Sequence, residues 1–176
     1  MLLKDEKQYG CLMVMVPTNY CNILVEFGKK IIPDKLLYIE GDEYGRETKP
    51  HCTVMYGFEP DLSEDQIKEV IGDVKTFKIS VHRLDMFRPE EKPYDVVVLK
   101  VKSPELEEMH ERANKLPNKD EYSEYTPHIT IGYVKKNSVS FDKPINLSIV
   151  VKDFEYSPIH EIQGTVKEHL HFALKK

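Results

Sequence analysis

The string PHCTVMY at residues 50–56 returns as PHITIGY at residues 127–133. Proline, histidine, threonine and tyrosine occupy identical positions in the two copies, and the fifth position is valine in one copy and isoleucine in the other. The two histidines, His51 and His128, lie 77 residues apart, close to half of the 176-residue chain. This spacing indicates two equivalent halves that each contribute the same polar side chains to one site.

Side chains alternate between the two faces of a β-strand. His51 and Thr53 therefore share one face of the first strand, and His128 and Thr130 share the matching face of the second. The intervening positions are apolar and end in the tyrosine of each string, so we expect both tyrosines on the packing side. The preceding prolines favour extended backbone before them and remove one ladder donor, so both histidines should enter their strands with similar geometry.

The rest of the chain mixes helix and strand patterns without regular βαβ alternation. Helices are expected from Thr18 to about residue 30, from Ser63 with a capping box to Gln66, and from Ser103 with Pro104 at the first position. Strands or short strands are expected at 9–17, 36–39, 77–87, 94–101, 147–156 and 165–174, and an exposed charged loop is expected at 41–49.

This order predicts an α+β fold rather than a doubly wound sheet. We expect one two-lobed, pseudo-symmetric domain over residues 1–176, in which two antiparallel sheets flank a central cleft and the helices lie outside.

Composition narrows the class of protein. The chain is 40% hydrophobic and 31% charged, and it contains no run near the roughly 20 apolar residues of a membrane helix. Its N-terminus is acidic and polar, and its three cysteines have no tight pair spacing, which indicates reduced thiols and a cytoplasmic protein. The net charge of −5 argues against binding to long duplex nucleic acid. We expect a monomer without a membrane partner.

Two histidines that face one cleft can act as general base and general acid near neutral pH. Cleavage of a phosphodiester needs both functions, together with donors for the charged non-bridging oxygens. The hydroxyls of Thr53 and Thr130, beside the two histidines, suit that second task.

At these residues the chain resembles the two-histidine phosphoesterase superfamily, which includes LigT-like RNA 2′,5′-ligases and 2′,3′-cyclic phosphodiesterases. The strings HCTV (51–54) and HITI (128–131) match its two motifs, and the element order from about residue 49 to 135 is similar to that of small phage-encoded members. The resemblance implies that His51 and His128 carry the acid–base chemistry, that Thr53 and Thr130 bind phosphate, and that no metal or other cofactor is used.

Members of that superfamily act on 2′,3′-cyclic phosphates, on 2′,5′-linked oligoadenylate or, for phage anti-CBASS members, on cyclic di- or trinucleotide immune signals. We therefore expect a phosphodiesterase for a nucleotide or short oligonucleotide, with a phage enzyme that degrades a cyclic nucleotide signal as the most specific form. One alternative is a module that sequesters a nucleotide without turnover. Another is a metal-dependent hydrolase, which a chelator would inactivate.

Other residues are weaker candidates. Tyr44 in the charged loop could stack on a base, and nearby basic side chains could contact phosphate: Arg46, Lys49, Lys135, Lys136 and Arg88. The HLH sequence at 169–171 has a spacing that metals can use, although a solvated strand face is the plainer interpretation. His110 is expected to be a packing residue, and His82 and His160 have no partner that the sequence reveals.

Overall fold

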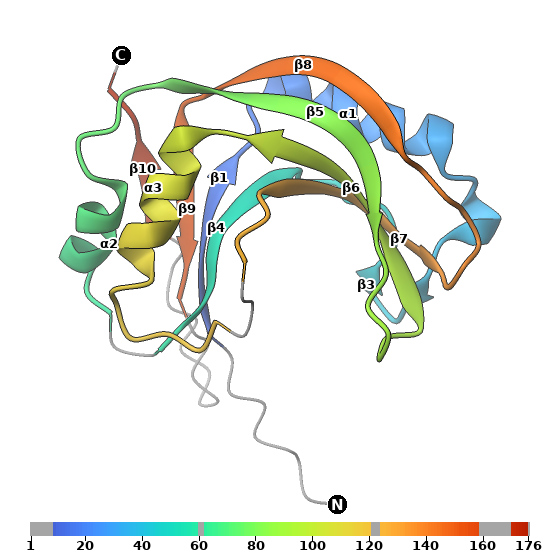
Figure 1. Ribbon diagram of the computed structural model, residues 1–176, viewed down its shortest axis with the longest axis horizontal. Coiled ribbons are helices and arrows are strands. Elements are labelled where there is room, and N and C mark those ends of the chain that lie inside the picture. The colour runs from blue at the N-terminus through green and yellow to red at the C-terminus, as the bar shows by residue number, and fades with distance from the viewer. Residues whose placement is uncertain (1–8, 60–61, 121–123, 159–169, 176) are drawn as a thin grey trace, which may run out of the picture.

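The computed structural model describes residues 9–59, 62–120, 124–158 and 170–175 (Figure 1). Eight strands form one sheet in the order β10–β9–β1–β4–β7–β6–β5–β8, and every pairing in it is antiparallel. The strands are β1 Gly10–Met15, β4 His51–Phe58, β5 Phe77–Phe87, β6 Tyr94–Lys102, β7 His128–Lys135, β8 Lys143–Val151, β9 Asp153–Ser157 and β10 Leu170–Ala173. The remaining elements are α1 Thr18–Ile31, a 3₁₀ helix Asp34–Leu36, a hairpin of β2 Ile39–Glu40 and β3 Glu43–Tyr44, α2 Glu64–Ile71 and α3 Pro104–Ala113.

The sheet consists of two halves of four strands that meet at β4 and β7, the strands that carry the repeated strings. Among the described residues, the ladder between these two strands holds one Cα pair, Cys52 with Ile129. The α+β class is as the sequence predicts. The two expected sheets, however, are two halves of one curved sheet with a narrow joint, because the central strands diverge on either side of this single pair (Figure 1).

Helices cover both halves of the sheet. In the first half α3 packs against β4, and α2 packs on α3 (Figure 1). In the second half α1 packs against β7, where Gly28 lies so close to Ile131 that an added Cβ would approach its side chain to 3.1 Å. Apolar side chains from both halves form one buried cluster, so the joint is held by packing as well as by backbone pairing.

Local signals place the starts of two of the three α-helices correctly. Ser63 and Gln66 form the predicted capping box, and the Ser103 hydroxyl accepts a hydrogen bond from the Leu106 amide at 3.3 Å. Thr18, expected as a cap, is instead the first residue of α1, and Pro17 holds the N-cap position without a side-chain hydrogen bond.

Two segments differ from the sequence prediction. The strand expected at 147–156 is divided at Lys152 into the end of β8, which pairs with β5, and β9, which pairs with β1. The chain thereby crosses from one half of the sheet to the other, at the polar pair Lys152 and Asp153 that the sequence prediction had placed inside one strand. The loop expected at 41–49 contains the short strand β3, and of the last expected strand only β10 falls within the described residues. No helix among the described residues is long and apolar enough to cross a membrane.

Candidate functional site

The two histidines have matching environments. The Nδ1 atom of His51 lies 2.9 Å from the Lys49 carbonyl oxygen, and that of His128 lies 2.8 Å from the Thr126 carbonyl oxygen. A carbonyl only accepts hydrogen bonds, so each Nδ1 carries the proton of the neutral ring. Each Nε2 is then left with its lone pair, which is the form that a general base requires.

The two prolines set this arrangement. The Pro50 carbonyl accepts a hydrogen bond from the amide of Val16, just after β1, at 3.2 Å. The Pro127 carbonyl accepts one from the amide of Val101 in β6 at 3.0 Å. The carbonyl of the residue before each proline is directed instead to the histidine. The expected similarity of the two strand entries is confirmed down to individual hydrogen bonds.

All four motif side chains flank the joint on one face. Cys52 and Ile129 point into the core, so the residues on either side of them point to the opposite face. Because the strands are antiparallel, His51 lies opposite Thr130, and Thr53 lies opposite His128. Each histidine is thus next to a threonine from its own strand and across from a threonine of the other.

Both strands carry a bulge directly after the threonine. The ladder to β1 shifts register across Val54, and the ladder to β6 shifts register across Ile131. A bulge adds one residue and reverses the faces of the residues beyond it. The prediction that the tyrosines pack under helices is therefore wrong: Tyr56 is 54% exposed, and both Tyr56 and Tyr133 line the same cleft as the histidines.

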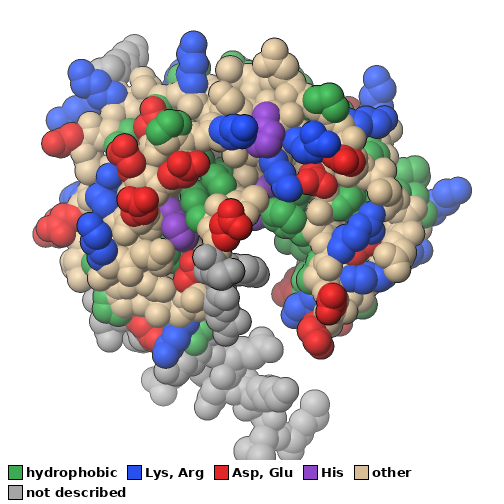
Figure 2. Space-filling view, viewed as in Figure 1, with side chains coloured by type: hydrophobic (Ala, Val, Ile, Leu, Met, Phe, Trp, Pro, Cys, Tyr) green, Lys and Arg blue, Asp and Glu red, His purple; other side chains and the backbone are tan. Residues whose placement is uncertain are grey.

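The cleft has a volume of about 800 Å³, in the range of sites for small molecules. It is lined by the four motif side chains, both motif tyrosines, the end of β5 with the following loop, His110 of α3, and the loop before β7. Figure 2 shows the molecule hollowed on this side, with acidic and basic side chains around the opening. Asp120 and Glu124 contribute the acidic lining, and Arg88 and Lys92 contribute the basic lining.

His128 is the more constrained of the two histidines. The ring of Phe87 meets its imidazole edge to face, with centroids 4.7 Å apart. Burial lowers the pKa of His128 below 6.5; the hydrogen bond to the Thr126 carbonyl opposes that shift, and the charge of His51 adds to it. The neutral form of His128 is therefore favoured.

A stacked pair supports the bulge in β4. The rings of His110 and Tyr125 lie parallel with centroids 4.0 Å apart. His110 Nδ1 lies 2.8 Å from the Val54 carbonyl oxygen, and the Tyr125 hydroxyl donates to the Thr53 carbonyl oxygen at 2.8 Å. His110, predicted to be only a packing residue, thus lines the cleft and provides a hydrogen-bond partner for the Val54 carbonyl in the bulge.

The basic residues expected to contact phosphate are placed differently from one another. Arg46 pairs with Asp34 at 2.6 Å and donates to the Ile32 carbonyl, so it ties the β2–β3 segment to the end of α1. Lys135 donates to the Lys35 carbonyl at 2.8 Å, and Lys49 is exposed. Among the residues that the structure describes, none of these three lines the cleft. Tyr44 does not line it either, but its ring contacts those of Tyr94 and Tyr133, which do.

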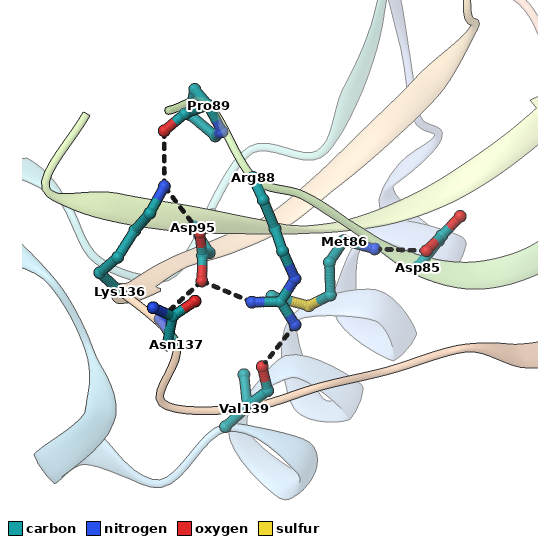
Figure 3. Close-up of polar contacts among 8 residues, drawn as sticks. All are labelled: Asp85, Met86, Arg88, Pro89, Asp95, Lys136, Asn137 and Val139. Carbon is teal, nitrogen blue, oxygen red and sulfur yellow. Dashed lines mark hydrogen bonds and ion pairs between the residues drawn. The ribbon is translucent and has the colours of Figure 1, made fainter. Parts of the chain in front are cut away.

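Arg88 and Lys136 converge on one buried carboxylate (Figure 3). Asp95, at the start of β6, is fully buried and accepts from Arg88 at 2.7 Å and from the backbone amide of Asn137 at 2.8 Å. Lys136 lies 3.3 Å from its other oxygen, and Arg88 also donates to the Val139 carbonyl at 3.0 Å. This network joins the loop after β5, on the cleft rim, to the turn after β7.

The remaining histidines lie away from the cleft lining or outside the described residues. His82 lies on β5, and His171 on β10 is 3.9 Å from Glu155. His160 and His169 lie outside the described residues, so the HLH prediction stays open. Within the part of the chain that the structure describes, no three His, Cys, Asp or Glu side chains are grouped so that they could hold a metal ion.

Sequence reasoning missed several residues of the cleft. Four of them carry no local signal, because they meet the motif strands only in the folded chain. They lie at the end of β5, on α3 and on two loops: Phe87, His110, Lys92 and Tyr125. Only the bulge in β7 had an available signal, the glycine at position 132 inside a strand pattern.

Comparison with known proteins agrees with this fold. A family model of the 2′-5′ RNA ligase superfamily matches residues 37–171, and the chain belongs to that superfamily. LigT of E. coli, in a structure with phosphate, shares the fold with a TM-score of 0.60 at 16% identity over 98% of this chain and 100% of that one. TT0787 of Thermus thermophilus matches with a TM-score of 0.57 at 17% identity over 95% of each chain.

A relative at higher identity is the anti-CBASS protein Acb1 of Vibrio phage KVP40. It is 33% identical over 85 residues, which are 48% of this chain and 51% of that protein. The chain therefore spans about half the length of this curated relative.

Proposed function

We propose that the protein is a phosphodiesterase that cleaves a nucleotide phosphodiester by two-histidine acid–base catalysis, without a metal ion. The observation that carries this proposal is the matched pair of histidines, each with Nδ1 held by a backbone carbonyl and each beside a threonine on the cleft face. Membership of the 2′-5′ RNA ligase superfamily supports it.

The reaction needs one proton removed and one delivered. One neutral imidazole accepts at Nε2 the proton of the attacking water or ribose hydroxyl, and the other, protonated, donates from Nε2 to the leaving oxygen. The threonine hydroxyls donate to the non-bridging oxygens as the negative charge on them is redistributed. The two Nδ1 contacts are alike, so they do not by themselves decide which histidine takes which role.

The lowered pKa of His128 distinguishes the two roles. Its neutral form is favoured, which suits the base, and His51 is then left to donate the proton. Phe87 against the His128 ring keeps water from that side and holds the ring in position.

The substrate proposed is a cyclic nucleotide or short oligonucleotide. The relative from Vibrio phage KVP40 is named an anti-CBASS protein. Anti-CBASS members of the superfamily act on cyclic nucleotide signals, which favours this substrate. The structural relative LigT has been captured with phosphate and with 3′-AMP, and a cleft of about 800 Å³ has room for ligands of that size.

The test is turnover of a substrate panel in the presence of a chelator. The panel holds 2′,3′-cyclic nucleotides, 2′,5′-oligoadenylate, and cyclic di- and trinucleotides, with products resolved by chromatography. His51→Ala and His128→Ala are each expected to lose roughly 10²- to 10⁴-fold in rate, and the double variant little more, because the two groups act as a unit. His82→Ala is the matched control, since His82 lies on β5 and does not line the cleft.

Each outcome separates the candidates. Turnover that resists chelator and disappears in both single variants supports the proposal. Loss of wild-type turnover with chelator would replace it with metal-dependent hydrolysis. Retention of one panel member without turnover would make the protein a sequestering module.

A further inference from the structure

Each repeated string contributes its tyrosine to the cleft in addition to its histidine and threonine. The bulges at Val54 and Ile131 bring Tyr56 and Tyr133 onto the face that already carries the histidines and threonines. The same device in both halves places a phenol ring at the same offset from each histidine. Acid–base chemistry and phosphate binding, as proposed above, leave these two rings without a role.

The two rings lie on opposite sides of the reaction centre. β4 and β7 are antiparallel and meet at Cys52 and Ile129, so the strands run in opposite directions from that pair. Each tyrosine lies four residues from the joint, at most roughly 13 Å at ~3.3 Å per residue. That distance leaves room for one nucleoside between a phosphate at the centre and each ring.

In the second half the ring belongs to an aromatic cluster. Tyr133 lies 5.1 Å from Tyr44 and 5.2 Å from Tyr94 between ring centroids, and Tyr44 and Tyr94 are 5.0 Å apart. Tyr38 joins both Tyr44 and Tyr94 at 5.3 Å. Tyr94 also lines the cleft, so part of this cluster faces the space beside the motif residues.

The backbone holds this cluster in place. Tyr133 exchanges hydrogen bonds with the segment around β2 and β3, donating to the Gly45 carbonyl at 2.8 Å and accepting from the Tyr38 amide at 3.0 Å. Gly132 permits this approach, because a Cβ there would lie 3.1 Å from the Gly45 oxygen. Tyr44 itself has a φ of 66°, a conformation that is strained for a tyrosine, and the surrounding contacts maintain it.

In the first half the ring stands more freely. Tyr56 is 54% exposed although it lines the cleft, and the ring of Tyr9 meets it edge to face with centroids 6.2 Å apart. A large exposed aromatic surface beside a polar site is typical of residues that stack on a ligand.

We propose that Tyr56 and the Tyr133 cluster are two nucleobase platforms, one in each half of the sheet. The substrate class is then a phosphodiester flanked by two nucleosides, as in a dinucleotide or a cyclic oligonucleotide, rather than a mononucleoside 2′,3′-cyclic phosphate. This inference rests on the proposed phosphodiesterase function for its reaction centre, but base stacking is measurable without turnover.

The experiment measures binding to the His51→Ala/His128→Ala variant, in which no substrate is consumed. The probes are a dinucleotide of two 2-aminopurine ribosides joined by one phosphodiester, and the methyl ester of one 2-aminopurine riboside monophosphate. Stacking on an aromatic ring quenches 2-aminopurine fluorescence, and the chain contains no tryptophan to interfere. Into this background we place Tyr56→Leu and Tyr133→Leu, with Tyr56→Phe and Tyr133→Phe as conservative replacements.

Each leucine variant is expected to weaken dinucleotide binding roughly 5- to 150-fold, the range for loss of one stacked base. The phenylalanine variants should retain most of the affinity and the quenching, because stacking needs the ring and not the hydroxyl. The matched control is Ile23→Ala, which removes an exposed apolar side chain from α1, outside the cleft lining. The dinucleotide should bind the parent variant more tightly than the methyl ester by a similar factor.

Two binding results would overturn the inference: a dinucleotide that binds no more tightly than the methyl ester, or leucine variants that bind the dinucleotide like their parent. Faster wild-type turnover of a 2′,3′-cyclic mononucleotide than of any two-base substrate would also overturn it while leaving the phosphodiesterase proposal intact. Tyrosine-dependent binding without any turnover would support the platforms and refute the proposed catalysis.

Discussion

Asp95 offers a sharp test of how the rim of the cleft is held. Its carboxylate is fully buried, and one oxygen accepts from both Arg88 at 2.7 Å and the backbone amide of Asn137 at 2.8 Å. Asp95→Ala removes both hydrogen bonds and leaves the Asn137 amide without this acceptor. Each bond to a charged group contributes about 1.5 kcal/mol at the low end of its range, so we expect a loss of about 3 kcal/mol in the free energy of unfolding.

The low end of the energy range per hydrogen bond is appropriate because Arg88 and Lys136 are not left buried without a partner when Asp95 is removed. The Arg88 and Lys136 side chains are 37% and 32% exposed, so water can replace part of what Asp95 supplies. For a chain of this length, about 3 kcal/mol corresponds to a fall of roughly 6–12 °C in Tm. Urea denaturation followed by circular dichroism, with thermal melting as a second readout, measures both quantities.

Asp142→Ala is the matched control for this experiment. Asp142 pairs with Arg83, but the two side chains are 67% and 40% exposed, so its loss should cost less than about 1 kcal/mol. Asp95→Asn keeps an acceptor for the Asn137 amide and should be intermediate. Equal destabilisation by Asp95→Ala and Asp142→Ala would refute the view that the buried network fixes the rim.

Three further predictions follow from other parts of the structure. Burial lowers the pKa of His128, so its imidazole stays neutral, and able to act as a base, at pH values below 6.5. The acidic limb of a plot of kcat/KM against pH should therefore have its midpoint below pH 6.5. A midpoint above that value would contradict the role of His128 as the base. Gly132→Ala places a Cβ 3.1 Å from the Gly45 oxygen and should lower the free energy of unfolding, measured in urea, by about 1–3 kcal/mol. An unchanged urea midpoint would show that the β2–β3 hairpin moves aside without cost. Burial raises the pKa values of the Cys11 and Cys52 thiols to about 12, so native protein at pH 8 should react quickly with Ellman's reagent only at Cys21, against three thiols after denaturation.

The sequence predicted those features that depend on neighbouring residues. The capping box at Ser63, the first turn after Ser103, and the shared face of His51 and Thr53 all follow from spacing along a helix or strand. The likeness of the two strand entries followed from the prolines, because a proline restricts its own φ and the residue before it wherever it occurs.

Features that depend on distant partners could not be predicted in this way. From the sequence Arg46 was expected to be a free cation beside the first string. Its partner Asp34 precedes the β2–β3 hairpin in the chain, whereas Arg46 follows it, so only the fold brings the two together. Asp95 sits in an apolar strand, and only the fold shows that Arg88 and Lys136 meet it there.

The sequence by itself determined that two equivalent strands present a histidine and a threonine on one face, since alternation over three residues needs no other information. Only the tertiary structure decided where Tyr56 and Tyr133 point. Each lies beyond a bulge, and a bulge forms where the register with a neighbouring strand, β1 or β6, gains one residue. Those neighbours come from distant parts of the chain, so the face on which each tyrosine lies is fixed by the pairing of strands and not by the string that contains it.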